Sequence, residues 1–196
     1  LDAGATVNSL EFTKDSKKLI AAGNRRTPGE EDKHGFVKSW DITNNWEVIF
    51  EIKALEKSVK SVRLSPDGKT FAVSGAVNQV KIFSYPEAKE LAVIDTILDV
   101  PGTIEAIAYH PEGNFIFAGG HGEVMHVYKT GTYKEVLTFP CNRVEYIDCA
   151  EDGRLMVTGH EDRGLLSLYL IWSKKYNDNY GKLSKEILRN KDLQNR

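Results

Sequence analysis

Few side chains in this sequence are of the types that do chemistry, and their spacing gives little support to a metal or catalytic site. The five histidines are His34, His110, His121, His126 and His160. A metal site needs several ligands that converge at short spacing. His121 and His126 stand five residues apart across an expected turn and strand, which would point them to opposite faces, and His160 belongs to a polar turn. We interpret these three as solvated loop residues and expect no metal.

Motifs of nucleophilic, zinc-dependent or nucleotide chemistry are also missing from the sequence. It contains no G-x-S-x-G, no H-E-x-x-H and no G-x-x-x-x-G-K-[ST]. The glycine-rich run at residues 119–122 does not lead into a helix N-terminus, which a phosphate cradle would use, so it indicates a β-turn. The acidic run at residues 30–32 is typical of a solvated loop. We therefore expect a protein that is not an enzyme and that carries no cofactor.

Composition and charge exclude several classes of protein. Of the 196 residues, 41% are apolar and 28% are charged, which is typical of a globular chain rather than a disordered one. No apolar run approaches the ~20 residues of a membrane span. A net charge of −2 excludes a strongly basic nucleic-acid scaffold. Cys141 and Cys149 are too few for a disulfide framework, so we expect two reduced thiols and a cytoplasmic location.

An internal repeat sets the elements that must position all of these residues. Four units begin at the apolar anchors Val7, Val59, Ile104 and Val144, at intervals of 52, 45 and 40 residues. In each unit, apolar residues or a cysteine follow three and five positions after the anchor, and an acid follows at the eighth. An apolar run closed by glycine comes next. Intervals of this size are typical of solenoids and propellers.

Each unit predicts short antiparallel strands. Positions three and five alternate as in a strand, whereas the step from the anchor to position three breaks the alternation and predicts a bulge. The acid and the residue after it, glycine in three units, predict a tight turn. A third strand is expected to end at Trp40, Phe83, Tyr128 and Leu168, the last three of which lie 24 positions after their anchors. Weaker fourth strands are expected at residues 46–52, 89–97 and 134–139. The fold class is thus all-β, a β-propeller of four-stranded antiparallel blades.

The residues that carry this repeat resemble those of the WD40 family. Residues 59–83 resemble one WD40 repeat, Trp40-Asp41 resembles the dipeptide that ends the third strand, and Asp67-Gly68 matches the turn of the first hairpin. The resemblance covers residues 6 to about 172 and implies WD40-like blades at about 6–52, 59–98, 104–139 and 144–173. A basic tail, either a short helix or a linker, is expected at residues 174–196.

The sequence also departs from the family pattern. Only one unit carries Trp-Asp, and no Gly-His pair precedes the first strand of a unit. The buried Asp–His–Ser–Trp network of the family therefore cannot form in its usual way, and we expect apolar packing to hold the blades together. The family usually has seven blades and this chain shows four. We expect a piece of a larger propeller, with the remaining blades from the rest of the chain or from a partner; the alternative is a closed four-bladed ring.

The resemblance implies that one rim of the propeller is the recognition face. Its loops join the second strand to the third or precede the first strand, where Lys57, Ser58 and Arg143 stand. The loop at residues 24–35 carries a nine-residue insertion, which is either a contact surface or a tolerated insertion. Two arginines in it could pair with a partner's carboxylates or phosphates. The candidate partner-binding residues are Arg25, Arg26, Glu30, Glu31, Asn78, Gln79, His121, Glu123, His160, Asp162 and Arg163.

These features predict a non-catalytic scaffold that binds other proteins within a multiprotein assembly. We expect its partners to be subunits of a larger complex, rather than nucleic acid or a membrane. One alternative is a propeller enzyme or small-molecule binder, lactonase-like or TolB-like, with a site in the central channel; the Asp-Gly-Lys turn at 67–69 occurs there too. Another is phosphoinositide or nucleic-acid binding through Arg25, Arg26 and the tail, which holds seven basic and three acidic residues.

Overall fold

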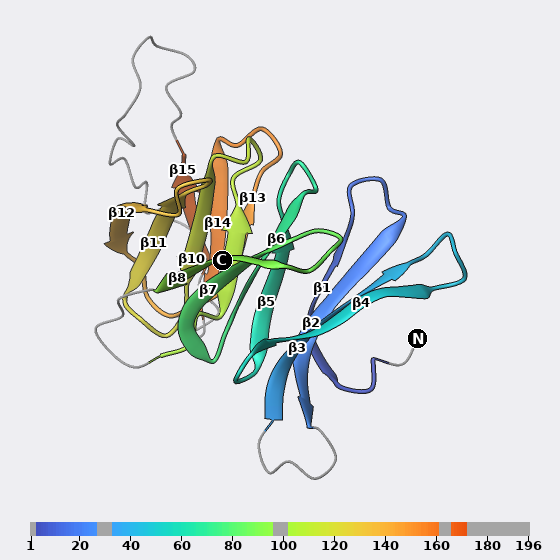
Figure 1. Cartoon of the computed structure of the whole chain (residues 1–196). Helices are drawn as coiled ribbons and strands as arrows, with labels where there is room; N and C mark the ends of the chain where they lie inside the picture. Colours follow the sequence, from blue (N-terminus) through green and yellow to red (C-terminus); the bar gives the residue numbers. More distant parts are fainter. Residues whose placement is uncertain (1–2, 27–32, 96–101, 161–165, 172–196) are drawn as a thin grey trace, which may run out of the picture.

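Four antiparallel β-sheets follow one another along the chain (Figure 1). The computed structural model describes residues 3–26, 33–95, 102–160 and 166–171. We number the sheets as blades 1 to 4. In each blade the strands lie side by side in chain order, and the first strands β1, β5, β9 and β13 pack in succession. The predicted all-β propeller of WD40-like blades is confirmed.

The blades have the following strands. Blade 1 consists of β1 (Thr6–Phe12), β2 (Lys18–Arg26), β3 (Lys33–Asp41) and β4 (Glu47–Leu55). Blade 2 consists of β5 (Val59–Leu64), β6 (Thr70–Gly75), β7 (Val77–Ser84) and β8 (Glu90–Asp95). Blade 3 consists of β9 (Ala106–Tyr109), β10 (Phe115–Gly119), β11 (Val124–Lys129) and β12 (Glu135–Pro140). Blade 4 is described as three strands, β13 (Val144–Cys149), β14 (Leu155–His160) and β15 (Leu166–Leu170).

The break in alternation at the start of the first strands is a β-bulge, as predicted. The register shifts directly after the anchor where β1 pairs with β2, β5 with β6, and β13 with β14. In β5 the bulge turns Val59 and Val62 into the same core, and neither is exposed. The bulged backbone comes so close to β6 that a Cβ on Gly75 would lie 2.0 Å from the carbonyl oxygen of Ser58. This close approach explains why glycine closes the apolar run.

The predicted acid–glycine turns are present as well. In blades 2, 3 and 4 the turn glycine adopts the left-handed conformation, with φ between 68° and 73°. In blade 2 the Asp67 carboxylate accepts hydrogen bonds from Ser65 Oγ (2.6 Å) and from the backbone N–H of Lys69 (3.1 Å). These bonds hold the pKa of Asp67 below its ordinary value. The turn residues thus set the register of the first hairpin in each blade.

The two middle blades each pack one face against the blade before and the other face against the blade after, which gives three junctions among the described residues. We call the face that carries the anchor residue the near face, and the opposite one the far face. At the junction of blades 1 and 2, Phe71 is fully buried between Phe50 and Phe83, with ring centroids 5.5 and 5.1 Å away. Similar apolar clusters fill the junctions of blades 2 and 3 and of blades 3 and 4.

Polar side chains of β1 satisfy the free backbone edge of β5. The N–H of Val62 donates to Ser9 Oγ (3.2 Å). The N–H of Leu64 donates to Glu11 Oε2 (2.7 Å). Burial raises the pKa of Glu11 to about 7, although the Leu64 hydrogen bond and the Arg63 guanidinium oppose the rise. Hydrogen bonds to the first strand therefore add to the apolar packing that the sequence predicted.

The loop expected at residues 24–35 is shorter than predicted. β2 continues to Arg26 and β3 begins at Lys33, and these two residues are paired partners in the ladder. Part of the insertion therefore extends β2 and β3. Each added pair of residues forms backbone hydrogen bonds between the two strands. The tip, residues 27–32, lies outside the described residues.

The third strand of blade 4 is displaced by one residue from the predicted alignment. Phe71 and Ile116 pair with Phe83 and Tyr128, whereas Met156, at the same repeat position, pairs with Tyr169. Leu168 was expected in that place. A shift of one residue exchanges the two faces of a strand, so Tyr169 is buried in the junction with blade 3 and Leu168 is 48% exposed.

Candidate functional site

A groove of about 700 Å³ opens to solvent on the rim formed by the loops before β5 and β9 and between β10 and β11. It lies at the junction of blades 2 and 3. Its lining residues come from five separate stretches of chain and are Lys57, Ala76, Val77, Asn78, Gln79, Asp95, Gly102, Thr103 and His121. Apolar and hydrogen-bonding groups therefore meet in one depression on the predicted recognition rim.

Hydrogen bonds within the chain fix the walls of this groove. Asn78 Oδ1 accepts a bond from the backbone N–H of Gly102 (3.0 Å), which ties β7 to the segment before β9. Gln79 Nε2 donates to Asp95 Oδ1 (2.8 Å) across β7 and β8. The backbone N–H of His121 donates to the carbonyl oxygen of Thr103 (3.1 Å). The groove is therefore formed before any partner arrives.

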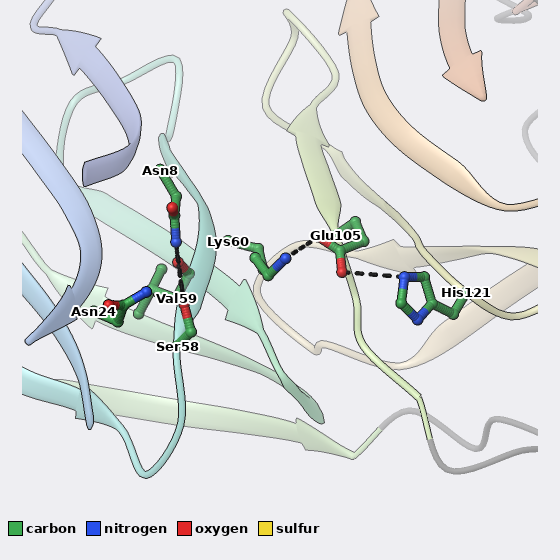
Figure 2. Close-up of polar contacts among 7 residues, drawn as sticks. All are labelled: Asn8, Asn24, Ser58, Val59, Lys60, Glu105 and His121. Carbon is green, nitrogen blue, oxygen red and sulfur yellow. Dashed lines mark hydrogen bonds and ion pairs between the residues drawn. The ribbon is translucent and has the colours of Figure 1, made fainter. Parts of the chain in front are cut away.

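A buried carboxylate links the two blades beside the groove (Figure 2). The Glu105 side chain is only 6% exposed, and its Oε2 lies 3.0 Å from Lys60 Nζ of β5. Its Oε1 lies 3.3 Å from His121 Nε2. Charge-assisted bonds of this kind are among the stronger polar contacts in proteins. Glu105 thus holds both Lys60 and His121, which are 37% and 45% exposed, in place at the rim.

A second, uncharged cluster links blades 1 and 2 on the same rim (Figure 2). Asn8 Nδ2 donates to the carbonyl oxygen of Val59 (2.7 Å) and to Ser58 Oγ (3.1 Å). Asn24 Nδ2 donates to the same hydroxyl (3.2 Å). Three amide and hydroxyl side chains therefore connect β1, β2 and the loop before β5.

Both rim clusters are built on one repeat position that the sequence analysis overlooked. Asn8, Lys60 and Glu105 each directly follow an anchor residue, as does Glu145 in blade 4. In the two middle blades the residues on either side of this position are buried: Val59 and Ser61 beside Lys60, and Ile104 and Ala106 beside Glu105. A polar residue at this place in all four units, next to an apolar anchor, was the signal in the sequence.

The structure brings three of the predicted site residues together and leaves others apart. Asn78, Gln79 and His121 line the groove. Arg25 does not: it forms an ion pair with Glu51 and lies 5.2 Å from the ring centroid of Phe36, within blade 1. A partner that uses Arg25 would have to replace that contact.

The remaining candidates lie elsewhere. Glu123 is exposed outside the groove. His160 is held in blade 4 by Thr158 Oγ1 (2.9 Å) and Ser167 Oγ (3.0 Å). For Arg26 the structure describes the backbone alone, and Glu30, Glu31, Asp162, Arg163 and the tail at residues 174–196 lie outside the described residues.

His126 is not the solvated loop residue that the sequence suggested. It lies in β11, is 4% exposed, and its Nδ1 is 2.7 Å from Glu135 Oε2 on β12. Successive side chains of β11 point to opposite faces of the blade. A neighbouring blade covers each face, so a side chain on either face is buried. The expected third strand already contained His126, and the interpretation failed because both faces of β11 are covered, so that Met125, His126 and Val127 are all buried.

Both cysteines are free thiols, as expected. Burial raises the pKa of Cys149 to about 12 and also raises the pKa of Cys141, so neither is a ready nucleophile at neutral pH. In the part of the chain that the structure describes, three or more potential metal ligands nowhere gather. Among the same residues there is no helix with the length and apolarity that crossing a membrane requires.

Comparisons with known proteins agree with this architecture. Over 174 residues the chain is 26% identical to the serine-threonine kinase receptor-associated protein of Gallus gallus, an alignment that covers 87% of this chain and 43% of that protein. The proteins of the same name from Mus musculus and Homo sapiens are 26% identical over 164 residues, which cover 82% of this chain and 44% of each relative. The chain thus spans less than half the length of these curated relatives.

A protein-family model matches most of the chain. Residues 39–165 match the model of the family described as eukaryotic translation initiation factor eIF2A. The matched region runs from the third strand of blade 1 into blade 4. It includes the residues of both rim clusters that belong to blades 2 and 3. This chain, a WD40-repeat propeller, therefore belongs to the eIF2A family.

Proposed function

We propose that this chain is a non-catalytic platform that docks other proteins within a multiprotein assembly, and that the rim groove at the junction of blades 2 and 3 is its binding site. The observation that carries the proposal is the preformed groove beside the Lys60–Glu105–His121 contact. A binding site whose walls are already fixed loses little conformational freedom when the partner binds.

The shape and lining of the groove favour a segment of another protein as the ligand. Small-molecule sites are usually concave and bury most of the ligand surface, whereas this groove is open along the rim. Its side chains offer a cation at Lys57, an anion at Asp95 and an imidazole at His121. Mixed polar groups around the apolar Ala76 and Val77 suit an extended peptide with both backbone and side-chain contacts.

The relatives support the same kind of function. Serine-threonine kinase receptor-associated protein is named for its association with another protein, and the matched family is named for translation initiation. We propose that this chain likewise acts by binding protein partners, and that its partners are subunits of a larger complex.

Affinity purification with variants of the groove tests the proposal. The tagged chain would be used to recover partners from an extract of its source, and the partner's affinity would then be measured by titration calorimetry. Lys57→Ala and His121→Ala should each weaken binding about tenfold, which is ~1.4 kcal/mol. Glu123→Ala, an exposed rim residue outside the groove, is the matched control and should leave the affinity unchanged.

Two results would contradict the proposed site. A partner whose affinity is the same for the wild-type chain, Lys57→Ala and His121→Ala would show that the groove does not bind it. Recovery of a small molecule in the groove, without any protein that depends on it, would favour the propeller enzyme or small-molecule binder instead.

A further inference from the structure

The rim groove at the junction of blades 2 and 3 carries a cation at one end and an anion at the other. The strands of blade 2 lie side by side in the order β5-β6-β7-β8, and residues beside or within each of them line the groove. Lys57 stands two residues before β5, and Asp95 is the last residue of β8. Ala76 and Val77 connect β6 to β7 and lie between the two charges. The groove therefore crosses the width of the blade.

The two charges are not neutralised within the protein. Among the residues that the structure describes, neither Lys57 nor Asp95 forms an ion pair, and both are exposed. Asp95 accepts a single neutral hydrogen bond, from Gln79 Nε2 (2.8 Å). Lys60 beside the groove differs, because the buried Glu105 carboxylate already pairs with it (3.0 Å). The charges of Lys57 and Asp95 are therefore available to a bound partner.

The repeat does not require these charges. The position two residues before the anchor holds, in blades 1 to 4, Ala5, Lys57, Gly102 and Asn142. Pairing with the third strand defines the second position, which holds, in blades 1 to 3, Lys53, Asp95 and Pro140. Of these three blades, only blade 2 combines a cation at the first position with an anion at the second. The packing of a blade therefore does not account for the pair.

The width of the blade sets the spacing of the groups that could meet both charges. Neighbouring strands lie about 4.8 Å apart, so the three spacings from β5 to β8 amount to about 14 Å. An extended chain rises about 3.3 Å per residue and covers this distance in about four residues. Because its successive side chains point to opposite sides, residues i, i+2 and i+4 would face the groove together.

We propose that the groove binds an extended segment of a partner protein with an acidic residue at one end, a basic residue four positions away, and an apolar residue midway between them. The acidic side chain contacts Lys57, the apolar one packs on Ala76 and Val77, and the basic one contacts Asp95. The inference rests on the proposed function, because it specifies the segment that the docking platform recognises.

A ligand of uniform charge fits this groove less well. The two ends are about 14 Å apart, which exceeds the screening length of about 8 Å at physiological salt. Each end therefore acts mainly on the partner group nearest to it. A nucleic-acid backbone or an acidic tail would be attracted at Lys57 and repelled at Asp95, whereas a segment with both charges gains at both ends.

Selection from a random peptide library on the purified protein tests the proposal, followed by affinity measurement with fluorescence anisotropy. The selected peptides should carry an acid and a base four positions apart with an apolar residue midway. Lys57→Glu and Asp95→Lys should each weaken their binding about fivefold or more, because an attraction becomes a repulsion. The double variant should bind a peptide whose two charges are exchanged, with an affinity within about threefold of the original pair.

Two further variants separate failure of this inference from failure of the proposed site. Lys69→Glu makes the same change of charge in the exposed β5–β6 turn on the opposite rim, and should alter the affinity less than about twofold. Ala76→Tyr fills the middle of the groove without changing its charge and should abolish binding. The thermal midpoint of each variant, compared with that of the wild-type protein, checks that it is folded.

The outcomes that overturn the inference are distinct. If no selected peptide depends on Ala76, the groove is not the binding site and the proposed function loses its site. If the peptides depend on Ala76 but bind equally to the two charge-reversed variants, the groove binds segments without reading their charge. Selected peptides that are uniformly acidic or uniformly basic would also contradict a segment of two opposite charges.

Discussion

The junction of blades 1 and 2 and the junction of blades 2 and 3 use the same repeat positions with different chemistry. At the rim, Asn8 links blade 1 to blade 2 through neutral hydrogen bonds, whereas Lys60 links blade 2 to blade 3 through an ion pair with Glu105. Deeper in the first junction, Glu11 and Ser9 bond the backbone of β5. In the second, the counterpart among the described residues is a longer bond (3.4 Å) from the N–H of Ile107 to Ser61 Oγ.

The comparison shows which features of a junction the backbone fixes and which features can vary between junctions. The bulge fixes where the residue after the anchor points, and the anchors fix the apolar contact. The polar side chain at the rim can then be an amide, an ammonium or a carboxylate, provided that its partner on the next blade matches it. Recognition can therefore evolve at the rim without altering the core.

The largest expected effect comes from breaking the aromatic core of the first junction. Phe71→Ala removes a fully buried ring between Phe50 and Phe83 and should lower the free energy of unfolding by about 3–5 kcal/mol. Phe12→Ala is the matched control, because Phe12 is 57% exposed in the chain alone. It should cost less than about 1 kcal/mol. Urea unfolding measures both, and similar losses would contradict the assigned junction.

The second effect is a pH dependence that distinguishes the first junction. Because burial raises the pKa of Glu11 from 4.5 to about 7, the folded state keeps a proton that the unfolded state releases between these values. Stability from this group should be full below about pH 4.5 and should fall as pH rises from there through 7, by about 3 kcal/mol. Asp148 of β13 adds to the rise in pKa, whereas Arg63 opposes it.

Glu11→Gln removes this titration and keeps an oxygen that can accept the Leu64 N–H. The free energy of unfolding, measured between pH 5 and pH 8, should fall less with pH in this variant than in the wild-type chain. Parallel pH profiles for the two proteins would show that Glu11 is not the titrating group.

The third effect concerns the ion pair of the second junction. Glu105→Gln keeps the shape of the side chain and removes its charge, so the variant should lose about 1–2 kcal/mol of stability. The loss should be smaller for Lys60→Met, because Lys60 is 37% exposed whereas Glu105 is 6% exposed. Chemical denaturation in urea at low and high salt measures both variants. Equal losses for the two would contradict a buried carboxylate that both Lys60 and His121 satisfy.

The fold could be predicted from the sequence because the same pattern of apolar and turn residues occurs four times in one register. Anchors, turn glycines and bulges were all predictable, since each depends on local backbone geometry and on apolar burial. The displaced strand β15 was not, because one additional residue before it leaves an equally apolar strand whose faces are exchanged. The pairing with β14 decides which of the two residues, Leu168 or Tyr169, faces blade 3 and is buried.

The candidate site was predictable only in part. The sequence expected Asn78, Gln79 and His121 in rim loops, and all three line the groove, although Asn78 and Gln79 lie in β7. The contacts of Arg25 with Glu51 and Phe36 depend instead on how far β2 and β3 extend. The role of Glu105 depends on a residue 45 positions earlier, Lys60, which no local pattern pairs with it. Side-chain partners across blades require the three-dimensional register.

The smallest expected effect sharpens the comparison between the two rim clusters. Asn8→Ala removes the bonds to Val59 and Ser58, both of which can be replaced by water on this exposed rim, so it should cost about 0.5–1 kcal/mol. Because the lost bonds are neutral, this cost should not change with salt, whereas the loss in Glu105→Gln should shrink as salt screens the ion pair. Urea unfolding at two ionic strengths separates the two clusters. A salt-dependent loss in Asn8→Ala would mean that the first junction also depends on charge, which would remove the contrast between them.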